Sequence, residues 1–419
     1  MNESGTARDR VDHSADLSTA PGGGTPVVPT QQAVPMALHT AYGAPTGPTL
    51  GAEEEFFVID TTTLQARGRA PEVLSGARTR YRGRRRESSM CAEITRLQVE
   101  AATPVCRSGR ELYGHIVDAR HALACAAREH GLGIVASGTA VIGDQAPAPL
   151  TKDDRYARID ARFGALRDAH AVCGCHVHVG VADREAAVHV CNHLRAWSPM
   201  LLALSVNSPF LLGRDTGHAS WRAVTWARLP SAGPPPFLPS AAEYDRAVDE
   251  MMASGAILDR RMVYWDVRLS AHLPTVEVRA VDAASTAEEA VLIALLVRGL
   301  AAVALRHWAE GRPDPAPSDQ TLRLSVWRSA HDGLEGEAFD PFRCELVPAH
   351  RLVRQMLEHA QQGLVPADAD FAGRLLDRLL AVGSGACRQR TAYARRGRLT
   401  DVVDLLVRQT RHGLAAVES

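Results

Sequence analysis

Four short segments of the chain each place two polar side chains two positions apart among apolar neighbours. Side chains alternate between the two faces of a strand, so residues i and i+2 share a face. The pattern therefore predicts four strands whose polar side chains gather on one side of a sheet. The four pairs are Glu53/Glu55, Gln98/Glu100, His176/His178 and Glu277/Arg279.

Carboxylates grouped on one sheet face repel one another and hold raised pKa values unless cations lie between them. Carboxylate oxygens are also the ligands that hard divalent cations prefer. The pattern therefore indicates a metal site. Glu54 points to the opposite face from Glu53 and Glu55, so we expect it to form a local salt bridge or hydrogen bond outside the site.

Composition narrows the class of protein. The 419 residues are 46% hydrophobic, which is ample for a core, and the formal net charge is −1. This balance gives no overall attraction to nucleic acid or to an anionic membrane.

Residues 1–45 are rich in Gly, Pro and Thr and predict a disordered tail without a signal peptide. Residues 46–415 are expected to form a single catalytic domain.

The eight cysteines are scattered, without the spacing of a disulfide framework or a zinc site. This usage indicates reduced thiols and a cytoplasmic protein. Cys173 and Cys175 come just before His176, and we interpret them as packing residues instead of metal ligands.

Regular elements alternate along the chain without the βαβ rhythm of a parallel sheet. Arginines at 78, 80, 82, 84, 85 and 86 form a basic run, interpreted as a solvated loop, with a cover over a phosphate-bearing ligand as the alternative. A Gly/Pro-rich loop over 207–237 is expected to line the site. Further strands are expected at 91–103, 131–139 and 275–281, and helices at 108–130, 151–168, 183–206, 285–309, 346–362, 366–382 and 399–412.

An ordered series of blocks extends these observations over residues 48–412. The blocks are 51–56 (GAEEEF), 98–106 (QVEAATPVC), 173–180 (CGCHVHVG), the 207–236 loop, 265–268 (WDVR) with 275–279 (TVEVR), and 385–390 (GACRQR). The series resembles the carboxylate-amine ligase family, also called glutamate–cysteine ligase type 2. The resemblance implies an α+β fold of the glutamine synthetase/guanido kinase type. In that fold a curved, mainly antiparallel sheet forms a funnel and helices pack outside.

The same resemblance implies ATP with Mg²⁺, or Mn²⁺ in its place, and two small-molecule substrates, a carboxylate such as glutamate and an amine. Arg268 and Arg279 are then expected to contact phosphate and act in catalysis together with Glu55, and Glu100 and His178 to contact the nucleotide. The metal- and ATP-site positions are Glu53, Glu55, Glu93, Glu100, His176 and Glu277.

The chemistry accounts for these residue types. Amide formation requires an activated acid, and transfer of the ATP γ-phosphoryl group to the carboxylate gives an acyl phosphate that an amine can attack. Carboxylates hold the metal that neutralises phosphate charge, and arginines clamp the migrating group. The chain has no Walker A sequence, which fits a nucleotide held by metals on a sheet face.

Several residues have a second interpretation. Glu93 alone is also consistent with a solvated carboxylate, and His178 with a substrate contact, a supporting residue or a core histidine. Arg222 is a candidate for gripping a substrate carboxylate, against a role in pinning the loop to Asp215. Arg388 and Arg390 are expected either to reach phosphate or to cap packed helices.

Two other functions stay open at this point. His176 and His178 with the surrounding glutamates suit a zinc or iron hydrolase or oxygenase, although the excess of carboxylates favours a harder ion. The other alternative is a non-catalytic nucleotide-binding relative. The helical C-terminal third also offers apolar surface for a homodimer.

Overall fold

A computed structural model describes residues 47–81, 89–143 and 147–413, so the predicted 1–45 tail lies outside the described residues. The main sheet is antiparallel throughout, in the order β2-β3-β1-β5-β9-β8, with β4 beside β1. This confirms the α+β class with a mainly antiparallel sheet. The strands are β1 (Leu50–Asp60), β2 (Ser89–Ala92), β3 (Gln98–Ala102), β4 (Leu132–Val135), β5 (Cys175–Gly180), β8 (Val267–Leu269) and β9 (Thr275–Val278).

One face of this sheet is apolar and packs on helices. Alternate residues such as Ala52, Val177 and Val278 are buried in one hydrophobic cluster with helix residues that include Ile116 and Leu292. Polar residues at the intervening positions are thereby turned to the other face. The helices beneath the sheet are α3 (Gly109–Arg128), α5 (Arg184–Ser205) and α8 (Ala287–Ala309).

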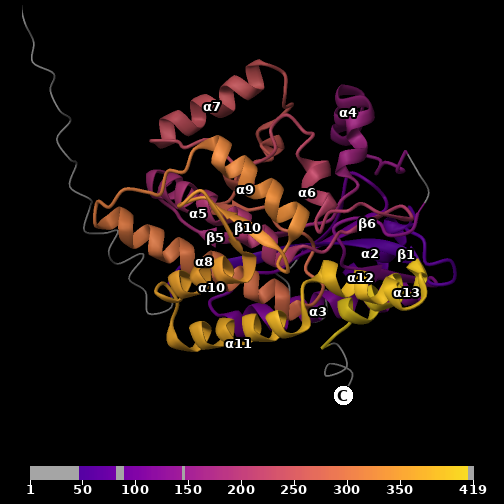
Figure 1. The fold of residues 1–419 in the computed structure, drawn as a ribbon. Helices are drawn as coiled ribbons and strands as arrows, with labels where there is room; N and C mark the ends of the chain where they lie inside the picture. Colours follow the sequence, from indigo (N-terminus) through magenta and orange to yellow (C-terminus); the bar gives the residue numbers. More distant parts are fainter. Residues whose placement is uncertain (1–46, 82–88, 144–146, 414–419) are drawn as a thin grey trace, which may run out of the picture.

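Further helices surround this core, as Figure 1 shows, with α10 and α11 at the bottom of the view and α4 and α7 at the top. Helix α8 is enclosed by neighbours over most of its length, because α5, α10 and α11 all pack against it. The remaining α-helices are α2 (Ala70–Tyr81), α4 (Asp154–Phe163), α6 (Trp221–Trp226), α7 (Ala241–Ala253), α9 (Asp319–Asp332), α10 (Ala349–Gln361), α11 (Pro366–Val382), α12 (Gly385–Arg396) and α13 (Leu399–Thr410).

The structure corrects several predicted elements. The single strand predicted over 91–103 is a hairpin, in which β2 pairs antiparallel with β3. The loop predicted over 207–237 contains a small hairpin, β6 (Phe210–Leu211) with β7 (Arg214–Asp215), and helix α6. Residues 78–81 of the basic run belong to α2, and arginines 82, 84, 85 and 86 lie outside the described residues.

Three other predicted elements have different bounds. The strand predicted over 131–139 is only the four residues of β4, and the helix predicted over 151–168 divides into α4 and a 3-10 segment, Gly164–His170. The helix predicted over 346–362 begins after a second small hairpin, β10 (Glu337–Asp340) with β11 (Glu345–Pro348). Helices α2, α7 and α9 were not predicted.

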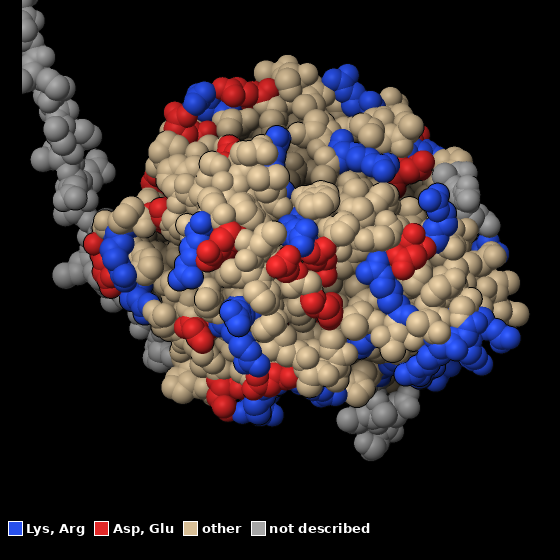
Figure 2. Space-filling model, viewed as in Figure 1, with Lys and Arg blue, Asp and Glu red and all other residues tan. Residues whose placement is uncertain are grey.

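Charges of both signs are interspersed over the face drawn in Figure 2, with basic side chains gathered near α12 and α13. This mixture agrees with the formal net charge of −1. In the part of the chain that the structure describes, no helix has the length and apolar character needed to cross a bilayer.

Candidate active site on one face of the sheet

The predicted polar pairs meet on one face because the strand register sets them side by side. Residues opposed in an antiparallel ladder project to the same face, with their Cβ atoms close together. The central strand β1 lies between β3 and β5, so its two site-face glutamates meet partners on both sides. The opposed pairs are Glu53/His176, Glu55/Glu100, His178/Glu277 and Arg268/Glu277.

Glu53 lies between the two imidazoles. Its Oε2 is 3.3 Å from Nδ1 of His176, and its Oε1 is 3.2 Å from Nε2 of His178. These two histidines hold the pKa of Glu53 far below its usual range, against the effect of burial. His178 also meets Oγ1 of Thr275 through its Nδ1, at 2.9 Å, which fixes the orientation of its ring. His178 therefore lies on the same face as Glu53 and contacts its carboxylate.

Three sets of side chains on this face each bring three ligand atoms within 4.8 Å of one another. They overlap, because Glu53 and Glu100 each belong to two sets. All six predicted metal-ligand positions are included, together with His178. The sets are Glu53/Glu100/His176, Glu53/His178/Glu277 and Glu55/Glu93/Glu100.

The third set carries the carboxylates that most need a cation. Burial and repulsion from Glu93 raise the pKa of Glu55 to about 8, although Arg222, Arg279 and the Gly174 N–H act in the other direction. Burial and repulsion from neighbouring carboxylates also raise the pKa of Glu100 well above its usual range. Glu93 lies in the turn of the β2–β3 hairpin, and burial raises its pKa too. Crowded oxygen donors of this kind fit a divalent cation such as Mg²⁺.

Glu277 is held between two arginines. Arg268 donates from Nε to Oε2 of Glu277 at 2.9 Å, and from Nη1 to the carbonyls of Arg261 and Val263, each at 2.7 Å. Arg279 donates from Nη1 to Oε1 of Glu277, while its buried Nε has no hydrogen-bond partner among the described residues. Arg268 is thus engaged in orienting Glu277, and Arg279 keeps a free donor on the site face.

Arg222 lies in α6 and is 2% exposed. It donates to the carbonyl of Arg279 at 3.2 Å, and a Cβ at Gly174 would lie 2.4 Å from its Nη2. Gly174 therefore leaves the room that the guanidinium fills. The alternative partner Asp215 is instead paired with Arg390, at 2.8 Å, so Arg222 does not pin the loop to Asp215, and Arg390 ties α12 to that loop.

The sequence interpretation missed Asp266, which precedes β8 and lies two positions before Arg268 on the same face. Its backbone accepts from the N–H of Arg279 at 2.7 Å, which sets Asp266 beside Arg279. Its buried Oδ2 has no hydrogen-bond partner among the described residues. Burial raises the pKa of Asp266 to about 7, against the charge of Arg222. The alternation in Trp265-Asp266-Val267-Arg268 was the available signal.

Three neighbouring side chains lie outside the site. Glu54, on the helix side, forms a buried pair with Arg120 at 2.6 Å, as predicted. Gln98 donates to the carbonyl of Val172 at 2.7 Å and supports the strand end instead of the ligand face. Cys175 is buried in the apolar cluster, which confirms the prediction of packing.

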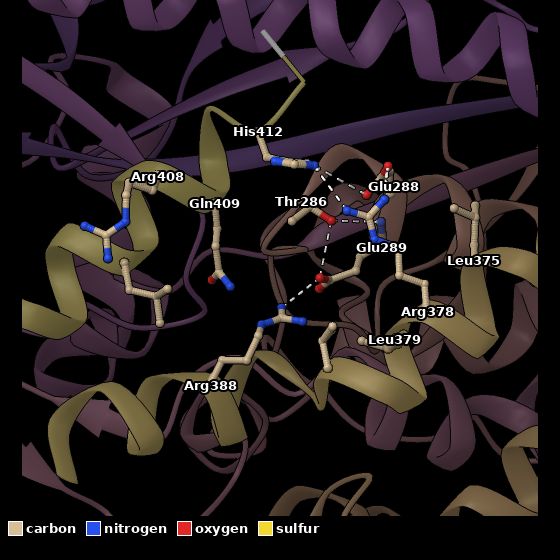
Figure 3. Close-up of a pocket in the computed structure, with 12 residues that line it drawn as sticks. Thr286, Glu288, Glu289, Leu375, Arg378, Leu379, Arg388, Arg408, Gln409 and His412 are labelled. Carbon is tan, nitrogen blue, oxygen red and sulfur yellow. Dashed lines mark hydrogen bonds and ion pairs between the residues drawn. The ribbon is translucent and has the colours of Figure 1, made fainter. Parts of the chain in front are cut away.

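A separate cavity of about 340 Å³ lies between the start of α8 and helices α11 to α13. Figure 3 shows Arg388 there, donating to Glu289 at 2.7 Å, and Glu288 paired with Arg378 at 2.7 Å. Glu289 also acts electrostatically on Arg120, the partner of Glu54, so this cavity lies on the helix side of the sheet. Arg388 therefore packs helices together, away from the carboxylate face.

Comparisons with known proteins agree with this architecture. The family model described as glutamate-cysteine ligase family 2 matches residues 49–408. Provisionally named glutamate–cysteine ligases 2-1 from Rhodococcus jostii and Saccharopolyspora erythraea are 42% and 43% identical. Each match covers 86% of this chain, and 96% and 94% of the respective relatives.

Solved structures share the fold at low identity. A glutamate–cysteine ligase from Francisella tularensis in complex with AMP superposes with a TM-score of 0.61 at 10% identity, covering 88% of this chain and 90% of that one. A bifunctional glutathione synthetase from Pasteurella multocida gives a TM-score of 0.58 at 12% identity, covering 92% and 54%. The chain belongs to glutamate–cysteine ligase family 2, and it is an ATP-dependent ligase.

Proposed function

We propose that this ligase uses Mg²⁺, or Mn²⁺ in its place, to join an amino-acid carboxylate such as that of glutamate to an amine through an acyl phosphate. The observation that carries the proposal is the overlap of three sets of ligand atoms on one sheet face. The names of the relatives suggest glutamate and cysteine as the substrates to test first.

The donor set favours this function over a zinc or iron hydrolase. Five glutamates and two histidines make up the three sets, so carboxylate oxygen dominates. Oxygen-rich sites suit Mg²⁺ or Mn²⁺, whereas sites of imidazole and thiolate suit zinc. The spread of ligands over β1, β3, β5 and β9 also fits the length of a polyphosphate.

The residues have separate roles in this proposal. The residues that would hold Mg²⁺ are Glu53, Glu55, Glu93, Glu100, His176 and Glu277. The bound metal would neutralise charge on the phosphates. Arg279 offers its buried, unpaired Nε to the migrating phosphoryl group, and Arg268 acts by holding Glu277. His178 lies where it could contact nucleotide or substrate. Arg222 is buried beside Gly174, whose N–H donates to Glu55, and it is the candidate for binding a substrate carboxylate.

The proposal is tested by Mg²⁺-dependent release of ADP and phosphate from a panel of carboxylates. Each acid is offered with and without a pool of amines, and products are identified by mass spectrometry. Release that depends on one acid, with an amide when an amine is present, would establish the reaction and name its donor. Acid-independent turnover, or tight Zn²⁺ binding without ATP cleavage, would overturn it.

A further inference from the structure

Asp266 is an acidic side chain of the site face that belongs to none of the three metal sets. It lies beside Arg279 in the strand ladder, and its backbone is fixed on both sides. Its N–H donates to the carbonyl of Gly233 at 2.8 Å, and its carbonyl accepts from Arg279 at 2.7 Å. The carboxylate therefore projects from a rigid position at the edge of the ligand face.

The carboxylate of Asp266 lacks the partners that a structural acid has. A buried carboxylate oxygen without a hydrogen bond costs free energy, so structural acids are normally saturated. Oδ2 of Asp266 is buried with no hydrogen-bond partner among the described residues. Arg222 exerts the main charge effect on it, but no ion pair between the two is formed.

Asp282 provides the comparison, because it is also buried and also lies near Arg222. Its carboxylate accepts from Ser208 Oγ at 2.6 Å, from Ser220 Oγ at 2.8 Å and from the Asn207 N–H at 2.9 Å. The hydrogen-bonding capacity of the Asp282 carboxylate is thus filled by protein donors, as is typical of a residue with a structural role. Asp266 is also buried, at 8% exposure against 0% for Asp282, but its Oδ2 has no such donor, which is typical of a group that awaits a ligand.

The missing partner has to be a cation or a hydrogen-bond donor. Phosphate and carboxylate ligands are excluded at this position by charge, since they would meet the carboxylate of Asp266. The metal has its own three ligand sets, which do not include Asp266. An acid such as glutamate also carries an ammonium group at neutral pH, but that group takes no part in the reaction, whereas the ammonium group of the amine has to lose protons before its nitrogen can attack. We propose that Asp266 binds the ammonium group of the amine substrate and accepts its first proton; this inference rests on the proposed function.

The ammonium transfers one proton to the Asp266 carboxylate, and the neutral nitrogen attacks the acyl-phosphate carbon. The C–N bond forms, the C–O bond to phosphate breaks, and the second nitrogen proton leaves with the phosphate. Burial raises the pKa of Asp266 to about 7, so the protonated carboxyl can release its proton to solvent afterwards.

Hydroxylamine tests this role, because it is a nucleophile that is largely uncharged at neutral pH. Hydroxylamine should capture the acyl phosphate as a hydroxamate without help from Asp266. In D266N we expect hydroxamate formation close to wild type, and amide formation from an ammonium-type amine reduced by about 10²–10⁴-fold. Equal losses of both products, or no loss of either, in folded D266N would overturn the proposal.

D282N is the matched control, since it removes an equal charge near Arg222 but leaves Asp266 in place. Its ratio of hydroxamate to amide should equal that of wild type, even if both rates fall. The same altered ratio in D282N and D266N would mean that Asp266 acts only through Arg222, against the proposal. Wild-type enzyme that forms neither hydroxamate nor ADP with any acid would overturn the ligase proposal itself, and this inference with it.

A second measurement compares wild type with D266N over a series of amines of similar size. At constant total amine, the free-base fraction falls about tenfold for each unit of ammonium pKa. More basic amines are also better nucleophiles, but this effect is the same in both enzymes. If Asp266 accepts the proton, the rate of amide formation should fall less steeply with ammonium pKa in wild type than in D266N, and equal slopes would overturn the proposal.

Discussion

Glu53 and His176 face each other across β1 and β5, with Oε2 of the carboxylate 3.3 Å from Nδ1 of the imidazole. Burial and the charge of Arg279 lower the pKa of His176 to about 4, while the two histidines lower that of Glu53. At neutral pH the pair is therefore a carboxylate beside a neutral imidazole. Both groups are in the protonation state that metal ligation requires.

Glu55→Gln should abolish ATP turnover without weakening the metal-free fold. Since the pKa of Glu55 is raised to about 8, the side chain is protonated at pH 7, and glutamine imitates that neutral form. We expect an unchanged or higher free energy of unfolding without Mg²⁺, and a loss of ADP release of about 100-fold or more. Chemical denaturation and an ADP assay check this; full activity would remove Glu55 from the site.

Glu277→Gln should behave differently, because Glu277 is ionised and 2% exposed between two arginines. The change leaves Arg268 and Arg279 buried without their counter-charge. Breaking a buried pair in this way typically costs about 3–5 kcal/mol. Denaturation of E277Q beside E55Q compares the two sites directly. Equal stability of both variants would contradict the assignment of Glu277 as the anion between the arginines.

The stability of the metal-free protein should fall as pH rises from about 6.5 to 8. Folded Glu55, with a pKa of about 8, keeps a proton that the unfolded chain, with a pKa near 4.5, has lost. More protons are then bound in the folded state, so the free energy of unfolding decreases with pH. His176 opposes this only between its lowered value of about 4 and 6.5.

Mg²⁺ should reverse that dependence, since it displaces the shared protons of the Glu55/Glu93/Glu100 set. We expect its apparent affinity to rise with pH over the same range, with protons released on binding. A metal present at a hundredfold excess over its Kd adds about 2.7 kcal/mol to the free energy of unfolding. Calorimetry in two buffers of different ionisation enthalpy measures the number of protons released when Mg²⁺ binds. Binding that is independent of pH would contradict the raised carboxylate pKa values.

More of the site than of the surrounding fold could be predicted from the sequence, because side chains alternate strictly between the two faces of a strand. Glu53/Glu55 and His176/His178 needed only a period of two, and any antiparallel register that paired their strands would bring them to one face. Asp266 obeys the same rule. It was missed because β8 has only three residues, too few to show the alternation on both sides.

The missed elements have a weak local signal. The turn of the β2–β3 hairpin, over 93–97, contains no Gly, Pro or Asn, so nothing in the sequence divided the predicted strand. Helix α9 buries only four of its residues and has no continuous apolar stripe. The basic run begins inside helix α2, at Arg78, and its charge masked the helical pattern. Tertiary contacts, which a local pattern does not contain, decide such elements.

Glu54→Gln should lower stability without a specific effect on catalysis. Glu54 faces away from the metal sets and pairs with Arg120, and side-chain exposures of 4% and 0% make this an enclosed ion pair. Arg120 keeps its bonds to the carbonyls of Ala284 and Ser285 but loses its counter-charge. We expect a loss of about 3–5 kcal/mol, with kcat of the folded enzyme within about twofold of wild type. A kcat reduced as far as in E55Q would contradict the separation of the two faces.

Arg222→Ala tests whether this arginine grips a substrate or supports the site. The guanidinium acts on the buried carboxylates Glu55, Asp266 and Asp282, and its removal leaves them without a shared cation. We therefore expect a lower Tm and comparable increases in KM for ATP and for the acid. Arg222→Lys, which keeps the charge, should recover part of the Tm. A selective increase in KM for the acid at unchanged Tm would instead establish the predicted contact between Arg222 and the substrate carboxylate, because loss of a support would weaken both substrates alike.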